Sequence, residues 1–261
     1  RQMCIRDRAR ITEVLAEKPS INDDDAKDIA VADGSIEFDD VSFSYNGNPD
    51  NPNLEHINLK IASGETIGII GGTGSAKSTL VQLIPRLYDV TSGAVKVAGH
   101  NVKEYKIQTL RHSVSMVLQK NVLFSGTIKE NLKWGNADAT DAEIEEACRA
   151  AAADGFIKGF PDGYDTELGQ GGVNVSGGQK QRIAIAGMLA MQPKVLVLDE
   201  ATAMLDPKGR RDIIDLVTKL HKENGITVVM ITQYMEEAIG ADRVAVMLSL
   251  IHISEPTRRR G

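Results

Sequence analysis

The sequence has little cysteine, few aromatic residues and no excess of positive charge. Its 261 residues include two cysteines, Cys4 and Cys148, which are too few for a disulfide framework and fit a reducing cytoplasm. Lysine and arginine number 30 against 36 acidic residues, a formal net charge of −6. Because a general nucleic-acid binder presents a basic face, this balance predicts that nucleic acid is not a partner.

Long hydrophobic runs are also missing. A membrane-spanning helix needs about 18–20 consecutive apolar residues. The longest apolar segments here are Ile67–Ile70, Val195–Leu198 and Ile226–Ile231, which have the length of buried strands. The N-terminus carries no apolar core of a secretory signal. We therefore expect any membrane role to act through partners or through a part of the protein outside this sequence.

Strands alternate with helices along the chain, which predicts an α/β fold with a mainly parallel sheet covered on both faces. We interpret residues 1–34 as a linker helix and N-terminal segment, 35–248 as one folded domain with a helical insertion over about 120–190, and 249–261 as a tail. The expected strands are 35–43, 57–61, 66–70, 94–97, 114–118, 195–198, 226–231 and 244–248. The expected helices are 9–18, 77–87, 141–153, 177–190, 235–239 and one that begins after Asp206-Pro207. A capping box over 140–143, formed by Thr140 and Glu143, opens the helix over 141–153.

Both ends of the chain depart from this pattern. Residues 1–8 (RQMCIRDR) and the tail resemble translated sequencing-adapter read-through from assembled environmental sequences, and natural polar termini are the alternative. We expect no return strand after 244–248. We assign no functional residue to either end.

A glycine-rich segment over residues 71–78 (GGTGSAKS) follows an expected strand and opens an expected helix, which is the context of a phosphate-binding P-loop. Lys77 supplies positive charge, the Ser78 hydroxyl can ligate Mg²⁺, and Thr79 is placed to contact an α-phosphate. A glycine-rich turn that binds no nucleotide is the alternative. The residues whose backbone would cradle the phosphates are Gly71, Gly72, Thr73, Gly74, Ser75 and Ala76.

The apolar run over 195–198 ends in two acids, Asp199 and Glu200. A strand buried on both faces carries such acids to the carboxyl edge of the sheet, where open α/β sheets bind ligands. Asp199 would hold Mg²⁺ through water, and Glu200 would act on the attacking water as general base. Solvated acids after a buried strand are common, so this assignment depends on the P-loop.

The segment 174–182 (NVSGGQKQR) is typical of a helix N-terminus that can hold an anion, because the first N–H groups and the helix dipole favour phosphate. An ordinary helix cap is the alternative. We expect Lys180 and Arg182 to lie on a solvated helix face. The candidate anion-binding residues are Ser176, Gly177, Gly178 and Gln179.

These three motifs together resemble the ATP-binding-cassette (ABC) ATPases, and the resemblance extends over residues 9–248. It implies a P-loop NTPase fold with a RecA-like core, an antiparallel β portion and a helical insertion, with ATP and Mg²⁺ as cofactors. It also implies a head-to-tail dimer, in which segment 175–179 closes over ATP held by a second ABC ATPase domain. The other implied partner is a transmembrane transporter domain or subunit, at the cytoplasmic face of the cell membrane.

Three further residues receive roles from this resemblance alone. Gln119, in VLQKNVLF, matches the family's Q-loop, which senses Mg²⁺ and the γ-phosphate, so the resemblance implies that Gln119 is a Mg²⁺ ligand. Tyr45, in FSYNG, matches the aromatic residue that stacks on adenine, and Asp206 matches the D-loop. The alternatives are a solvated loop glutamine and a tyrosine of the core or of a hairpin. Asp206 is also a good helix N-cap.

Two positions depart from the family pattern. Ala76 replaces the glycine before the P-loop lysine, so its methyl group would crowd the phosphates or strain the backbone; near-normal binding is the alternative. Gln233, in MITQYMEEA, replaces the usual histidine, and it keeps a donor and an acceptor but cannot become a cation. We expect slower hydrolysis with nucleotide binding largely retained. A degenerate, non-hydrolysing partner in a heterodimer is the second hypothesis.

The resemblance changes along the chain. Residues 9–182 resemble multidrug or lipid exporters, whereas 183–247 (including RIAIAGMLAMQPKVLVLDEATAMLDPKGR) resemble the ATPases of cobalt and energy-coupling-factor importers. We hypothesise a recombinant or assembly chimera with its seam near the start of the 177–190 helix. A natural, divergent ABC subunit is the alternative.

Overall fold

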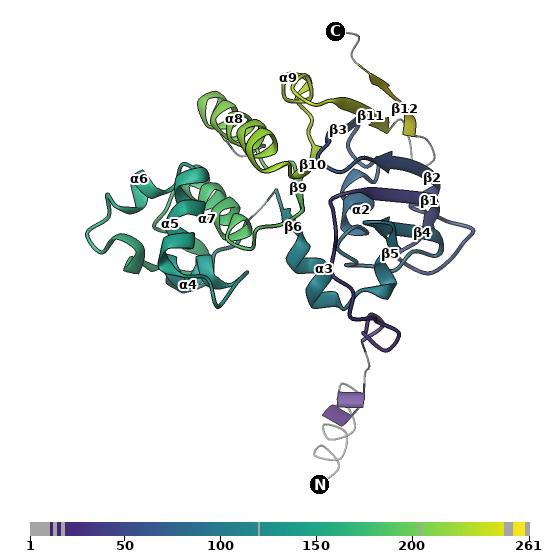
Figure 1. Cartoon of the computed structure of the whole chain (residues 1–261), viewed down its shortest axis with the longest axis horizontal. Coiled ribbons are helices and arrows are strands. Elements are labelled where there is room, and N and C mark those ends of the chain that lie inside the picture. Colours follow the sequence, from purple (N-terminus) through teal and green to yellow (C-terminus); the bar gives the residue numbers. More distant parts are fainter. Residues whose placement is uncertain are drawn as a thin grey trace.

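The computed structural model describes residues 11–12, 15–16, 19–119, 121–203 and 205–247, and the backbone of 253–258. The opening octapeptide and most of the helix predicted over 9–18 therefore lie outside the described residues. Within the described part, two main sheets and a group of helices build the fold (Figure 1).

A six-stranded sheet forms the centre, in the order β12-β11-β3-β10-β9-β6. All its neighbouring strands pair in parallel except β12, which is antiparallel to β11. The prediction of a mainly parallel sheet is confirmed. The strands are β3 (Thr66–Gly71), β6 (Val114–Val117), β9 (Val195–Asp199), β10 (Thr227–Ile231), β11 (Arg243–Met247) and β12 (Ile253–Arg258).

The prediction of no return strand after residue 248 is wrong. Strand β12 pairs with β11, from Arg243 opposite Arg258 to Met247 opposite Ile253. Without β12, strand β11 would be the edge of the sheet. An edge strand presents unpaired N–H and C=O groups that a following segment can pair with, whatever its side chains.

The central strands are buried on both faces, as the apolar runs predicted. In β9, Val195 and Val197 belong to one hydrophobic cluster, whereas Leu196 and Leu198 belong to the other. The helix α2 (Lys77–Gln82) packs in the first cluster, and the helices α7 (Gly177–Leu189) and α8 (Pro207–Asn224) pack in the second. The parallel sheet therefore separates α2 from α7.

An antiparallel sheet covers the α2 side, in the order β2-β1-β4-β5. It confirms the antiparallel portion that the resemblance implied. The helix α3 and the 3-10 helix η1 continue from it into β6. These elements are β1 (Ile36–Phe43), β2 (Leu54–Ile61), β4 (Ser92–Val97), β5 (His100–Asn101), η1 (Val102–Glu104) and α3 (Ile107–Ser113).

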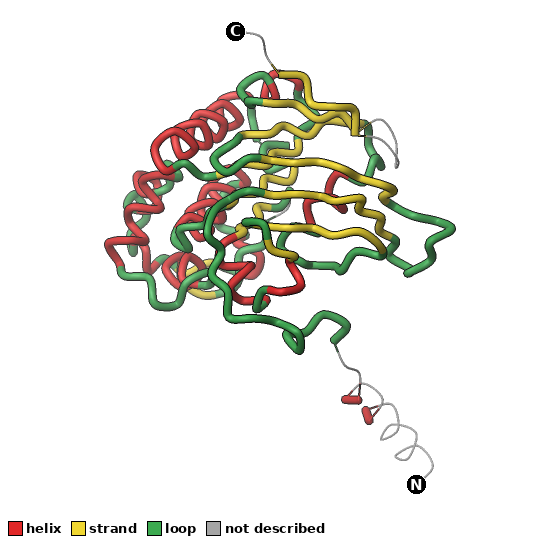
Figure 2. Tube along the Cα trace, turned by 45° about the vertical axis from the view of Figure 1, so that its right-hand side comes forward, coloured by secondary structure: helices red, strands yellow, loops and turns green. Residues whose placement is uncertain are grey.

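The other side of the parallel sheet carries the helices between residues 128 and 189, and Figures 1 and 2 show them apart from the antiparallel sheet. The capping box predicted at Thr140 is confirmed: its hydroxyl accepts from the Glu143 N–H, and the Glu143 carboxylate accepts from the Thr140 N–H. The elements are β7 (Gly126–Thr127), α4 (Ile128–Lys133), α5 (Asp141–Ala150), α6 (Asp154–Ile157), η2 (Gly163–Asp165), β8 (Glu167–Leu168) and η3 (Gln170–Gly172).

Two helices are shorter than predicted. The helix expected over 77–87 ends at Gln82, because Pro85 lacks an N–H and disfavours the helical conformation of the residue before it. The helix expected over 141–153 ends at Ala150, two residues before Ala152 turns left-handed with φ of 49°. In the described part of the chain, no helix combines the length and apolar character needed to cross a membrane.

Candidate functional site

Four segments of the candidate site meet at one edge of the parallel sheet. The P-loop follows β3, Gln119 follows β6, Asp199 ends β9, and Gln233 follows β10. The carboxyl ends of parallel strands lie at the same edge, which is where open α/β sheets bind ligands. Because β10 lies between β3 and β9, Gln233 leaves the sheet between the P-loop and the two acids.

The P-loop is closely packed against the sheet. The Lys77 ammonium is buried and donates to the carbonyl oxygens of Gly71 and Gly72, both at 2.9 Å. A side chain at Gly71 would place its Cβ 2.5 Å from the carbonyl oxygen of Met247, so only glycine fits there. Gly74 has φ of 81°, a left-handed conformation that glycine adopts without strain.

Ala76 has a strained backbone, one of the two effects expected of an alanine at this position. It stands at the N-cap of α2 with φ of 59° and ψ of 22°, the left-handed helical region. A non-glycine residue there carries an unfavourable energy of about 1–2 kcal/mol. Its methyl group packs against the hydrophobic cluster beside α2.

Ser78 and Asp199 meet although 121 positions separate them in the chain: the Ser78 hydroxyl donates to Asp199 Oδ1 at 2.9 Å. Burial raises the pKa of Asp199 above its ordinary value of 3.8, and repulsion from Glu200 adds to this, whereas the Ser78 hydrogen bond and Lys77 act in the opposite direction.

The Ser78 hydroxyl and the Asp199 carboxylate fit Mg²⁺, because this ion prefers hard oxygen ligands. It is usually held by one or two carboxylates together with substrate phosphates. Within the described residues, no group of three or more His, Cys, Asp and Glu side chains could hold a metal ion by itself. The residues that fit are thus Ser78 and Asp199, with further ligands from water and phosphate.

Glu200 contacts two other predicted site residues, Gln233 and Gln119. Its Oε2 accepts hydrogen bonds from Gln233 Nε2 at 2.7 Å and from Gln119 Nε2 at 3.1 Å. Glu200 also has φ of 49°, which is uncommon for a non-glycine residue and concentrates at functional sites. The structure brings these three residues together.

Tyr45 lies beside the start of α2. Its hydroxyl is 3.0 Å from the Thr79 hydroxyl, and its ring makes edge contacts with Phe43 and Tyr88 at centroid distances of 4.8 and 5.1 Å. The side chain remains 49% exposed. Tyr45 is therefore not a core residue: it lies in the connection between the antiparallel strands β1 and β2, close to the P-loop, and its stacking on adenine stays a prediction.

The segment around Ser176 caps the helix α7. The Ser176 hydroxyl accepts from the Gln179 N–H at 3.3 Å, and the Gln179 side chain accepts from the Ser176 N–H at 2.9 Å. Because α7 and α2 lie on opposite faces of the parallel sheet, the fold does not bring Ser176, Gly177 and Gly178 onto the P-loop of the same chain.

The prediction of a solvated face at the start of α7 is wrong in part. Arg182 pairs with Asp212 of α8 at 2.6 Å, and Gln181 is buried and accepts from Asn121 at 2.5 Å. The apolar pattern of α7 does not indicate these two contacts, because Asp212 and Asn121 lie far from α7 in the sequence and come next to it only in the folded chain. The predicted N-cap at Asp206 is confirmed, since its carboxylate accepts from the Gly209 N–H at 3.1 Å.

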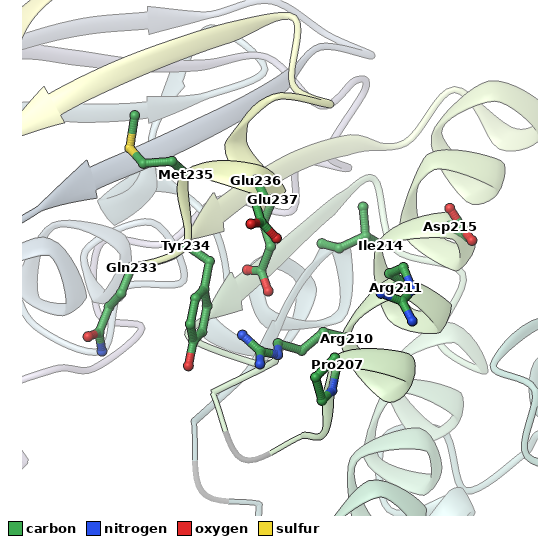
Figure 3. A pocket seen from close by; sticks show the side chains of 10 residues that line it. All are labelled: Pro207, Arg210, Arg211, Ile214, Asp215, Gln233, Tyr234, Met235, Glu236 and Glu237. Atoms are coloured by element: carbon green, nitrogen blue, oxygen red, sulfur yellow. The ribbon is translucent and has the colours of Figure 1, made fainter.

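A cleft of about 520 Å³ lies beside Gln233, between α8 and the short helix α9 (Met235–Ala238). Figure 3 shows Arg210 reaching into it from α8 and Glu237 from α9. The Arg210 guanidinium lies 4.2 Å from the centre of the Tyr234 ring, a cation–π contact.

Sequence reasoning missed three buried residues at this edge: Glu237, Thr202 and Thr232. Both threonine hydroxyls donate to Glu237 Oε2. In the sequence, Glu236-Glu237 is indistinguishable from the ordinary acids of a first helical turn. No pattern marked one of the two as buried.

The chain is similar to known proteins in both sequence and structure. A family model described as "ABC transporter" matches residues 54–203. A protein of Staphylococcus aureus strain NCTC 8325, named as a multidrug export ATP-binding/permease protein, is 44% identical over 222 residues, 85% of this chain and 38% of that protein. A protein of the same description from the bovine strain RF122 is 42% identical over the same shares. A solved structure of a bacterial Atm1-family ABC exporter with ATP bound has a TM-score of 0.88 at 30% identity, covering 98% of this chain and 45% of its own.

The chain spans 38% of the length of these curated relatives. A matched stretch of 222 residues within a chain of 261 has to include residues 40–222, so the similarity to the export proteins continues beyond residue 183. The importer-like character of 183–247 and the chimera hypothesis stay predictions.

Proposed function

The chain belongs to the ABC transporter family, and we propose that it binds MgATP and hydrolyses it to power transport across a membrane. The observation that carries this proposal is the convergence at the carboxyl edge of the sheet. There Ser78 contacts Asp199, and Gln233 contacts Glu200, at 2.9 and 2.7 Å.

We assign binding of the nucleotide to the P-loop and to Tyr45. Lys77 would exchange its present bonds to loop carbonyls for the β- and γ-phosphates, and the backbone N–H groups of the loop would hold the β-phosphate. Tyr45 would stack on the adenine ring. Mg²⁺, held by Ser78 and Asp199, supplies neutralisation of phosphate charge when it is bound.

We assign the proton transfer to Glu200. As general base, it would take the proton of the water that attacks the γ-phosphorus, while the bond to the β-phosphate oxygen breaks. Gln233 and Gln119 donate to one Glu200 oxygen, Oε2, and this fixes the direction of the carboxylate. Such positioning is the main contribution that a protein makes to phosphoryl transfer.

A second chain is part of the proposal, because segment 175–179 does not reach the P-loop of its own chain. We propose a head-to-tail dimer in which this segment closes over ATP bound to the partner. A membrane-spanning transporter domain or subunit, at the cytoplasmic face of the cell membrane, would receive the resulting motion. The similarity to multidrug export proteins favours an exporter.

A second candidate function is a non-hydrolysing ATP-binding half of a heterodimer. The left-handed backbone of Ala76 and the glutamine at position 233 favour it. The arrangement of Lys77, Asp199 and Glu200 favours hydrolysis.

The test is steady-state ATP turnover by the purified 261-residue chain, compared with Glu200→Gln, together with calorimetric ATP binding by both. We expect Mg²⁺-dependent turnover that Glu200→Gln abolishes without loss of ATP binding. ATP binding without turnover in the unsubstituted protein would support the second candidate. Absence of ATP binding would overturn both.

A further inference from the structure

Glu237 is a buried acid whose surroundings differ from those of its exposed neighbour Glu236. It is only 6% exposed, and one of its oxygens, Oε2, accepts two hydrogen bonds. The donors are the hydroxyl groups of Thr202, at 2.9 Å, and Thr232, at 2.5 Å. Both threonines are buried as well, at 4% and 1% exposure.

The two threonines belong to the segments that carry the proposed hydrolytic residues. Thr202 lies two positions after Glu200, and Thr232 lies directly before Gln233. Thr232 has a second role, because its hydroxyl accepts from the N–H of Tyr234 at 3.0 Å. Through the two hydrogen bonds that it accepts, Glu237 Oε2 therefore links the segment after β9 to the segment after β10.

Glu200 requires such support because its backbone is strained. Its φ of 49° carries an unfavourable energy of about 1–3 kcal/mol, and such a conformation persists only where the surroundings hold it. The Glu200 N–H is held by the carbonyl oxygen of Ile231 at 3.1 Å. The bond from Thr202 to Glu237 holds the chain on the other side of Glu200.

We propose that Glu237 is a positioning residue for ATP hydrolysis, which ties the segment after Glu200 to the segment before Gln233 and thereby maintains their contact. This inference rests on the proposed function. Its oxygen Oε1 is buried and has no hydrogen-bond partner among the described residues, although Glu237 lines the cleft beside Arg210 (Figure 3). The tie therefore depends on Oε2 and the two threonines.

Four variants test the proposal. Thr202→Val removes one donor with little change of shape, and Thr202→Ser keeps the hydroxyl. Glu237→Gln keeps an oxygen acceptor but weakens it, since an amide oxygen is a poorer acceptor than a carboxylate. Glu236→Gln makes the same chemical change on the exposed neighbouring acid.

We expect Thr202→Val and Glu237→Gln to lower kcat by about tenfold or more, because small displacements of reacting groups have effects of this size. The KM for ATP should change by less than about twofold, since the P-loop is untouched. Thr202→Ser and Glu236→Gln should stay near the unsubstituted kcat. Unchanged kcat in both disruptive variants would overturn the inference. The inference would also be overturned if the disruptive variants lost kcat and ATP affinity to the same extent and Thr202→Ser lost them too. Such a result would indicate a general structural role.

Hydrogen exchange separates this inference from the proposed function, because it needs no turnover. In Glu237→Gln, amides over 201–203 and 232–236 should exchange faster, while those of α5 stay unchanged. If the unsubstituted chain lacks turnover but Glu237→Gln still speeds exchange over these segments, the proposed function fails and the tie stands. If exchange over these segments is unchanged, the tie itself is contradicted.

Discussion

Gln233 donates a hydrogen bond from Nε2 to Oε2 of Glu200 at 2.7 Å. The residue that departs from the family's usual histidine thus contacts the proposed general base directly. A glutamine can orient this carboxylate, but it cannot carry a positive charge toward the phosphate. The contact therefore predicts that a substitution at position 233 changes hydrolysis more than nucleotide binding.

Gln233→His should increase kcat for ATP hydrolysis while ATP affinity changes little. An imidazole would take the place of the Gln233 amide beside Glu200, and it can become a cation, which would favour the negative charge that develops on the phosphate. Steady-state turnover and ATP calorimetry on the two proteins check this. If turnover is the same in both, residue 233 does not limit hydrolysis.

Ala76→Gly should tighten ATP binding, because it removes the methyl group that would crowd the phosphates. The relief of left-handed strain, about 1–2 kcal/mol, is offset by about 0.5–1 kcal/mol from the greater freedom of glycine in the unfolded chain, so stability should change little. Binding is measured in a Glu200→Gln background to prevent hydrolysis. Ala98→Gly is the matched control, because Ala98 also has a left-handed φ, of 48°, but lies outside the P-loop. Equal ATP affinities with and without the Ala76→Gly substitution would rule out impairment at this position.

Asp199→Asn should stabilise the nucleotide-free protein at pH 7 and abolish Mg²⁺-dependent turnover. Burial raises the pKa of Asp199, so folding favours the protonated form and the charged form is unfavourable at neutral pH. The gain should shrink as the pH falls through the raised pKa and vanish below the ordinary value of 3.8. Thermal melts over a pH series check this. A lower melting temperature of the variant at pH 7 would contradict the prediction.

Mixing two inactive variants should restore turnover if two chains build each site. Lys77→Ala disables the P-loop and Ser176→Arg disables the segment that faces the partner. A mixed head-to-tail dimer then contains one intact site, so random pairing should give roughly a quarter of the unsubstituted turnover per chain. Lys77→Ala mixed with Glu200→Gln is the control and should restore nothing, because both residues serve the same site. Absence of recovery in the first mixture would contradict the dimer.

Local features were predictable because they depend on a few adjacent residues. The capping box at Thr140, the N-cap at Asp206 and the buried strand β9 all follow from short patterns, and the structure confirms them. Strand β12 was missed because its pairing depends on the open edge of β11 and not on its own composition. The Arg182–Asp212 pair was missed because it joins two helices.

The sequence by itself determined the fold class, the P-loop and the identity of the acids that follow β9. Only the tertiary structure decided which of these residues meet: Ser78 with Asp199, Gln233 with Glu200, and Glu237 with two threonines. The physical reason is that the order of strands in the sheet depends on how the connecting helices pack against it. The number of residues between two motifs does not determine that order. Placing β10 between β3 and β9 brings Gln233 to Glu200, and no local pattern encodes that order.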